Sequence, residues 1–218
     1  ILNAVLPGRW VEGYVTKAGS GEKLKYRLNG LLVLITVVLT WAALCYSGIM
    51  PWDWFYQYRW ESLFGAIVFG LIFSFVVVLP HPPVKKFFLA DFYLGRALNL
   101  QLWRGRIDAK MWLYLVGAIM LELNVLSFAG HHHMLYVSDA FPVIFISGAL
   151  LTFFVFDYLT FEEVHLYTYD LFAERVGFKL GWGCIAFYPF FYAIPLWATA
   201  EMPDPGSSNF MLIISVVI

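Results

Sequence analysis

The chain has 218 residues, of which 61% are hydrophobic and only 13% are charged, and its mean hydropathy is +0.73. Ordinary soluble domains carry about 25% charged residues, so this chain is too apolar to cover its own surface in water. The formal net charge of −1 provides no strong field for a polyanion. We therefore predict an integral membrane protein with lipid and no nucleic acid among its partners.

Charge-poor stretches near the ~20 residues that cross a hydrocarbon core follow one another along the chain. Five are predicted to span the membrane as helices: Leu28–Trp52, Ser62–Val84, Met111–Ser138, Ala140–Phe156 and Leu180–Ala200. A sixth apolar run, Asn209–Ile218, reaches only about 15 Å at helical rise. The expected fold class is all-α, a polytopic transmembrane helix bundle with five spans plus the start of a sixth. Residues 1–218 would form one transmembrane domain, part of a longer protein.

Lysine and arginine are concentrated on one side of these spans. Five precede the first span, six follow the second and two follow the fourth, whereas Arg59 alone lies on the other side. The positive-inside rule therefore predicts a cytoplasmic N-terminus. It is compatible with a multi-pass protein of the bacterial inner membrane or the endoplasmic reticulum.

The basic-side loops carry most of the polar residues. Pro80-His-Pro-Pro83 is predicted to end the second span, because prolines remove helix donors. Phe87–Leu102 alternates rings with polar residues, which is typical of a helix lying in the membrane interface.

Three acids are candidates for a proton donor. Glu122 lies inside a predicted span, where a carboxyl is costly unless it is paired, neutral or near water; a structural acid bonded to a neighbouring helix is an equal alternative. Glu162 and Asp170 belong to a stretch rich in acids and tyrosines that could supply a proton in a partly dry site. Helix capping and solvent contact are the alternative there.

The fifth predicted span contains a misleading motif. Gly181-Trp-Gly-Cys-Ile-Ala186 matches G-x-G-x-x-A, but a dinucleotide fingerprint needs a preceding strand, and this run lies within an apolar span. Gly177 and Gly181 instead form a small-residue face for close helix approach.

Two prolines, Pro189 and Pro195, predict a kinked fifth span. By helical periodicity Tyr188 and Tyr192 share a face with Gly181. We expect these three residues to line a substrate cavity.

His131-His-His133 adjoins the third span on its non-cytoplasmic side. Three consecutive histidines cannot all point one way, and no cysteine or acid lies at familiar ligand spacing. A solvated loop is predicted, with no metal.

A series of short motifs resembles the sterol reductase family, which includes sterol Δ14-reductases, the reductase-like half of the lamin B receptor, and Δ7 and Δ24(28) enzymes. The motifs are Leu6-Pro-Gly8, Lys25-Tyr-Arg-Leu-Asn-Gly30, Asp91-Phe-Tyr-Leu-Gly-Arg-Ala-Leu-Asn99, Glu162-Glu163, Thr168-Tyr-Asp170, Val176-Gly-Phe178, and Gly183 followed by Pro189-Phe-Phe-Tyr192. Their order and spacing match the first half of a family member. One departure is Ala97-Leu-Asn-Leu-Gln101, where the family has E-L-N-P-R.

The resemblance implies NADPH-dependent reduction of a sterol double bond, with Δ14 favoured, by protonation to a carbocation and hydride transfer. The candidates for catalysis are Glu122, Glu162, Asp170 and Tyr192, the substrate-binding candidates are Tyr188, Tyr192 and Gly181, and the loop supports are Asp91, Arg96 and Asn99. Cofactor contacts are expected after Ile218.

Two alternatives belong to other functional classes. A catalytically silent sterol-binding or scaffold protein could keep the same fold. A small-solute transporter would also explain Glu122 and the proline kinks, although inverted repeats are not apparent.

Overall fold

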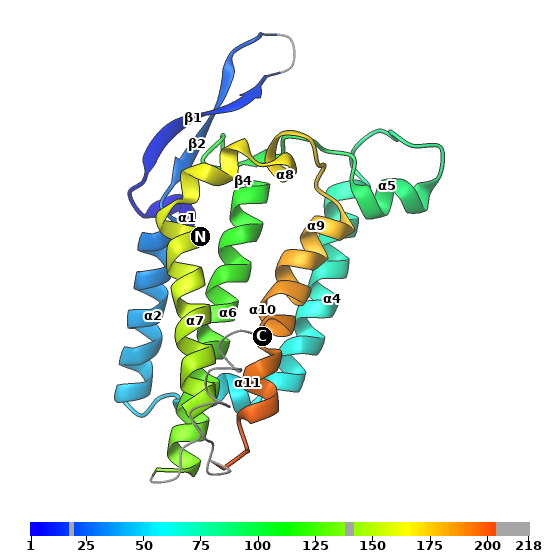
Figure 1. Cartoon of the computed structure of the whole chain (residues 1–218). Coiled ribbons are helices and arrows are strands. Elements are labelled where there is room, and N and C mark those ends of the chain that lie inside the picture. Colours follow the sequence, from blue (N-terminus) through cyan, green and yellow to red (C-terminus); the bar gives the residue numbers. More distant parts are fainter. Residues whose placement is uncertain (18–19, 138–141, 204–218) are drawn as a thin grey trace.

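The computed structural model describes residues 1–17, 20–137 and 142–203, so the predicted sixth run, Asn209–Ile218, lies outside the described residues. The described chain is mostly helical (Figure 1). Four helical runs are long and apolar enough to cross a membrane: α4 (Arg59–Val78), α6 (Ala109–Leu135), α7 (Pro142–Thr160) and a segmented run, Phe178–Thr199. The chain is therefore a multi-pass membrane protein.

The first predicted span is shorter than expected. Helix α2 (Gly30–Tyr46) is an apolar helix of 17 residues, which reaches about 25 Å at 1.5 Å per residue. The second span also ends early, at Val78, because two residues later the proline-rich segment cannot continue a helix. The count of five spans and the cytoplasmic N-terminus remain predictions.

The segment before α2 differs from the all-α prediction. Strands β1 (Arg9–Thr16) and β2 (Lys23–Leu28) form an antiparallel hairpin in which Arg9 pairs with Leu28. In β2 the buried residues are Leu24, Tyr26 and Leu28, and charged residues alternate with them. This period of two is the signature of a half-buried strand. A membrane bundle thus carries a small β-hairpin at one end.

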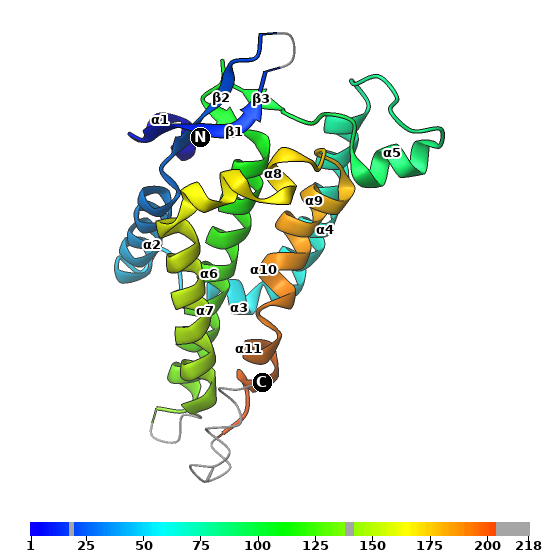
Figure 2. The ribbon, with the colours of Figure 1, turned by 45° about the horizontal axis from the view of Figure 1, so that its top comes forward.

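Short elements connect the spans at both ends. They are α1 (Leu2–Val5), α3 (Trp54–Gln57), α5 (Phe88–Leu94), the paired strands β3 (Gln101–Leu102) and β4 (Ile107–Asp108), the 3-10 helix η1 (Glu162–Tyr167) and α8 (Tyr169–Phe172). The hairpin, α5, η1 and α8 gather at one end of the bundle, and α3 lies at the other (Figures 1 and 2). Thirteen of the fourteen lysines and arginines are on the hairpin end, as the loop charges predicted. We call it the basic end.

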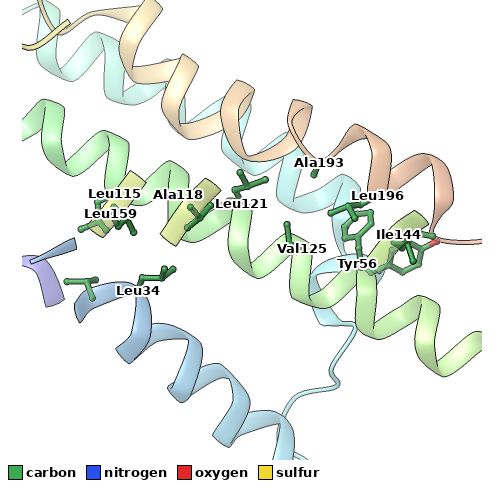
Figure 3. Packing of buried hydrophobic residues seen from close by; sticks show 14 residues of the cluster. Leu34, Tyr56, Leu115, Ala118, Leu121, Val125, Ile144, Leu159, Ala193 and Leu196 are labelled. Carbon is green, nitrogen blue, oxygen red and sulfur yellow. The ribbon is translucent and has the colours of Figure 1, made fainter. Parts of the chain in front are cut away.

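Helix α6 is the centre of the bundle. More than half of the apolar stretch of α6 is buried inside the protein. In α4 and α7, by contrast, most of the apolar stretch is not buried, as in helices that face lipid. The fully buried residues of α6 include Leu121 and Phe128. They pack with Leu34 of α2, Ile144 of α7 and Leu196 of α11 in one apolar cluster (Figure 3). Helix α6 therefore fixes the positions of the spans around it.

The fifth span is broken into four helical pieces. They are α9 (Phe178–Trp182), the π-helical turn η2 (Gly183–Phe187), α10 (Tyr188–Phe191) and α11 (Ile194–Thr199). Pro189 and Pro195 each lie in the first turn of the piece that contains them, where a missing N–H costs least. The predicted kinks are therefore present, and in the described chain the element directly before the glycine motif's helix is α8, not a strand.

Candidate functional site

A cleft of about 500 Å³ opens between α6, α7 and the fifth span. Its lining residues are Tyr114, Phe154, Tyr158, Asp170, Lys179, Leu180, Gly183, Cys184, Phe187, Tyr188 and Tyr192. The wall is mostly aromatic and apolar, and Asp170 and Lys179 provide its charged side chains. This volume lies within the roughly 300–1,000 Å³ of pockets that enclose drug-sized ligands.

The acid in the cleft is Asp170, and it is bonded to a phenol. The Tyr114 hydroxyl donates a hydrogen bond of 2.9 Å to Asp170 Oδ2. The backbone of α8 is held by a side chain of α6. The buried Lys110 Nζ donates hydrogen bonds to the carbonyl oxygens of Asp170 (2.9 Å) and Leu171 (2.7 Å). A lysine on α6 thereby satisfies two backbone carbonyls of the short helix α8, one of them that of Asp170 itself.

Three tyrosines make up much of the remaining wall. The ring centroids of Tyr158 and Tyr188 lie 6.5 Å apart, and the Tyr192 ring stacks parallel to that of Phe154 at 6.1 Å. Among the described residues the buried Tyr188 hydroxyl has no hydrogen-bond partner. A buried hydroxyl without a partner costs free energy, so this atom has unused hydrogen-bonding capacity.

Gly181 does not share the face of Tyr188 and Tyr192, contrary to the periodicity argument. A Cβ atom there would lie 2.8 Å from Cδ1 of Phe73 on α4, so Gly181 faces that helix. The reason is the π-turn η2, which inserts extra residues per turn between position 181 and the tyrosines and rotates the later side chains. Gly181 instead allows the close helix approach that its spacing with Gly177 predicted.

The other two acid candidates lie outside this cleft. Glu122 Oε1 accepts a hydrogen bond of 3.1 Å from Thr152 Oγ1 of α7. Glu162 Oε2 accepts one of 2.9 Å from the backbone N–H of Gly30, the first residue of α2. Burial raises the pKa of Glu162 to about 7, although backbone N–H donors oppose that shift. Glu122 thus links α6 to the next helix, α7, whereas Glu162 links η1 to α2, which lies 132 residues earlier.

The predicted loop supports form a buried ion pair, with one exception. Asp91 accepts hydrogen bonds from Arg96 Nε (2.9 Å) and from the backbone N–H groups of Lys85 (2.7 Å) and Val84 (3.1 Å). Burial alone would raise the pKa of Asp91, but these donors together hold it below its ordinary value. Asn99 is exposed.

The three histidines are not a solvated loop, because they form part of the last turns of α6. The ring of His131 stacks on Tyr56 with centroids 3.6 Å apart, and its Nδ1 lies 3.0 Å from Asp53 Oδ2. The buried His132 Nδ1 lies 3.0 Å from the Ala200 carbonyl oxygen. These contacts with the loop before α4 and with the end of α11 extend the helix beyond the apolar run.

Two residues of the site were missed in the sequence. Tyr114 stands one turn after Lys110 on α6, so helical spacing could have placed both near the acid-rich stretch. Gly117 allows α6 to approach the fifth span, since a Cβ there would lie 2.6 Å from the carbonyl oxygen of Cys184. Nothing in the local sequence identifies that partner.

Comparison with known proteins agrees with the motif series. Residues 1–198 match the model of the "Ergosterol biosynthesis ERG4/ERG24 family". The chain is 28% identical to a Delta(14)-sterol reductase, ERG24, of Saccharomyces cerevisiae, over 89% of this chain and 49% of that protein. It is 26% identical to a Delta(14)-sterol reductase of Methylotuvimicrobium alcaliphilum (88% of this chain, 46% of that protein). It is also 26% identical to a Delta(14)-sterol reductase of Arabidopsis thaliana, over 90% of this chain and 55% of that protein.

The chain thus spans about half the length of the curated relatives it matches. The family match covers nearly the whole described chain, including the segments that form the cleft. The resemblance inferred from the motifs is confirmed. This chain belongs to the ERG4/ERG24 family of ergosterol biosynthesis.

Proposed function

We propose that the full-length protein reduces a carbon–carbon double bond of a sterol, with Δ14 as the favoured position and NADPH as the hydride source. The observation that carries the proposal is the aromatic cleft, which holds one hydrogen-bonded carboxyl–phenol pair. The names of the relatives support the double-bond position. A rigid polycyclic lipid suits a long apolar wall that opens between membrane helices.

Reduction of an isolated alkene needs a proton and a hydride. Protonation at one carbon would leave a carbocation at the other, and NADPH, when bound, would supply the hydride that completes the saturated bond. The Asp170 carboxyl and the Tyr114 hydroxyl, 2.9 Å apart, form a hydrogen-bonded pair in this cleft that can hold a proton and pass it to a bound alkene. The surrounding rings would exclude water, which would otherwise capture the cation.

The unpartnered Tyr188 hydroxyl supplies the polar contact. We assign it a hydrogen bond to the sterol hydroxyl, because a polar group on an otherwise apolar ligand fixes its orientation. The same reasoning makes Tyr192 an apolar wall residue, stacked on Phe154.

The described cleft residues do not form a complete dinucleotide site. Lys179 is the cation among them, and its ammonium pairs with Glu174. The several phosphates of NADPH need more donors than this. We therefore assign the cofactor contacts to the part of the relatives' sequences that this chain does not cover.

The test is reduction by the purified full-length protein. With NADPH and a Δ14-unsaturated sterol, mass spectrometry should detect a product two hydrogens heavier. Asp170→Asn and Tyr114→Phe should each lower kcat by roughly 10²–10⁴, the usual contribution of a positioned acid. Tyr167→Phe, which alters an exposed phenol near the same end, is the matched control. Absence of sterol-dependent NADPH oxidation with Δ14, Δ7 and Δ24 substrates would refute the proposal.

A further inference from the structure

A second pocket, of about 200 Å³, lies at the basic end, between the segment that includes α5 and the segment that follows η1. Its lining residues are Lys85, Leu94, Gly95, Tyr169, Ala173, Glu174, Arg175 and Lys179. Three of these side chains are cations and one is a carboxylate, so the pocket has an excess of two positive charges. Lys179 lines both this pocket and the aromatic cleft.

A chain of hydrogen bonds fixes the backbone that carries these cations. The backbone N–H of Lys85 donates to Asp91, Asp91 pairs with Arg96, and the carbonyl oxygen of Arg96 accepts a bond of 2.7 Å from Arg175 Nη1. A bridge between Ala97 and Val176 runs alongside, with an N–H···O distance of 2.8 Å. Two segments about 80 residues apart are thereby tied together before any ligand arrives, which reduces the ordering cost of binding.

The pocket adjoins an exposed apolar shelf. On and just before α5, Phe87 is 69% exposed, Leu89 77% and Tyr93 50%, and the pocket residue Leu94 is also exposed. Figures 1 and 2 show α5 projecting from the bundle beside the ends of α4 and α9. Exposed rings and aliphatic side chains next to cations are typical of a segment that lies in the membrane interface.

We propose that this pocket binds the phosphate headgroup of an anionic phospholipid, while α5 rests in the acyl boundary beside it. Basic pockets at the ends of transmembrane helices suit such headgroups. The volume is below the roughly 300–1,000 Å³ of pockets that enclose drug-sized ligands, which fits a headgroup whose acyl chains stay in the bilayer. A free phosphate or a nucleotide would gain nothing from the apolar shelf, and this favours the lipid. The assignment does not depend on the sterol reaction.

The test measures lipid binding by the full-length protein in neutral detergent, with native mass spectrometry as the readout. Dihexanoyl phosphatidylglycerol should bind roughly 30-fold more tightly than dihexanoyl phosphatidylcholine, from the contribution of two cations near a membrane surface. Lys85→Gln and Lys179→Gln should each weaken phosphatidylglycerol binding about fivefold. Both side chains are exposed, so neither change should disturb packing.

The matched control is Lys23→Gln, which removes an exposed cation from the hairpin at the same end. It should leave the affinity unchanged. Equal affinity for the two lipids, or equal losses in Lys23→Gln and Lys85→Gln, would overturn the proposal. Displacement of phosphatidylglycerol by equimolar inorganic phosphate or by NADPH would also overturn it, since the pocket would then be a site for a soluble anion.

Discussion

Substitution of Gly117 by alanine tests whether the close approach of α6 to the fifth span shapes the cleft. A Cβ atom at this position would lie 2.6 Å from the Cys184 carbonyl oxygen and 2.5 Å from Cδ1 of Tyr188. To reach the 3.4 Å of an ordinary contact, the carbonyl would have to retreat by 0.8 Å. Because that oxygen belongs to the backbone, the two helices must separate, and the Tyr188 ring must turn.

The expected cost follows from two opposing effects. Overpacking of this kind costs about 1–3 kcal/mol, and replacing glycine by alanine within a helix returns up to about 1 kcal/mol. We expect Gly117→Ala to lose about 1–2 kcal/mol, which lowers Tm by roughly 2–8 °C for a chain of this size.

The assay is thermal unfolding in detergent, followed by circular dichroism. Gly65→Ala is the matched control, because it lies within α4 with no atom within 4 Å of the added methyl. It should leave Tm unchanged or raise it. If Gly117→Ala is as stable as Gly65→Ala, the reasoning from the close contact is refuted.

Other substitutions test separate contacts. Glu162 has a folded pKa of about 7, above the ordinary 4.5, so its contribution to stability is fully present below pH 4.5 and is lost as the pH rises through 7. Unfolding measured from pH 4 to 8 should therefore show wild type losing about 3 kcal/mol relative to Glu162→Gln; parallel profiles would contradict this. Asn124→Ala should cost about 1–2 kcal/mol, because Asn124 Nδ2 donates a 3.0 Å bond to the buried Pro189 carbonyl; an unchanged Tm would show that this carbonyl has another partner. Gly95→Ala should prevent a stable fold, since Gly95 has φ of +89° and packs directly on the Val176 backbone; normal yield and monodispersity on size exclusion would disprove it.

Composition and charge predicted the membrane setting and the basic end because both depend on sums over many residues. The hairpin was overlooked for a different reason. Its alternation of Leu24, Tyr26 and Leu28 with charged residues is visible in the sequence, but the segment was interpreted only from its charge and its family motifs. Periodicity, applied to the same residues, would have indicated a strand.

The site was predictable only in part. Asp170, Tyr188 and Tyr192 were selected from residue type and position, and all three line the cleft. The face of Gly181 was wrong because a π-turn changes the angular spacing of side chains, and apolar sequence does not reveal such a turn. The pairing of Tyr114 with Asp170, 56 positions away, depends on how α6 packs, which no local pattern specifies.

The contact between Glu162 and Gly30 has a consequence for biosynthesis. The carboxylate that completes the start of α2 is encoded 132 residues downstream. At ~5–20 residues per second, a ribosome needs about 7–26 s to add that many residues. During this interval the start of α2 lacks this bond, which can form only after α7 and η1 have been synthesised.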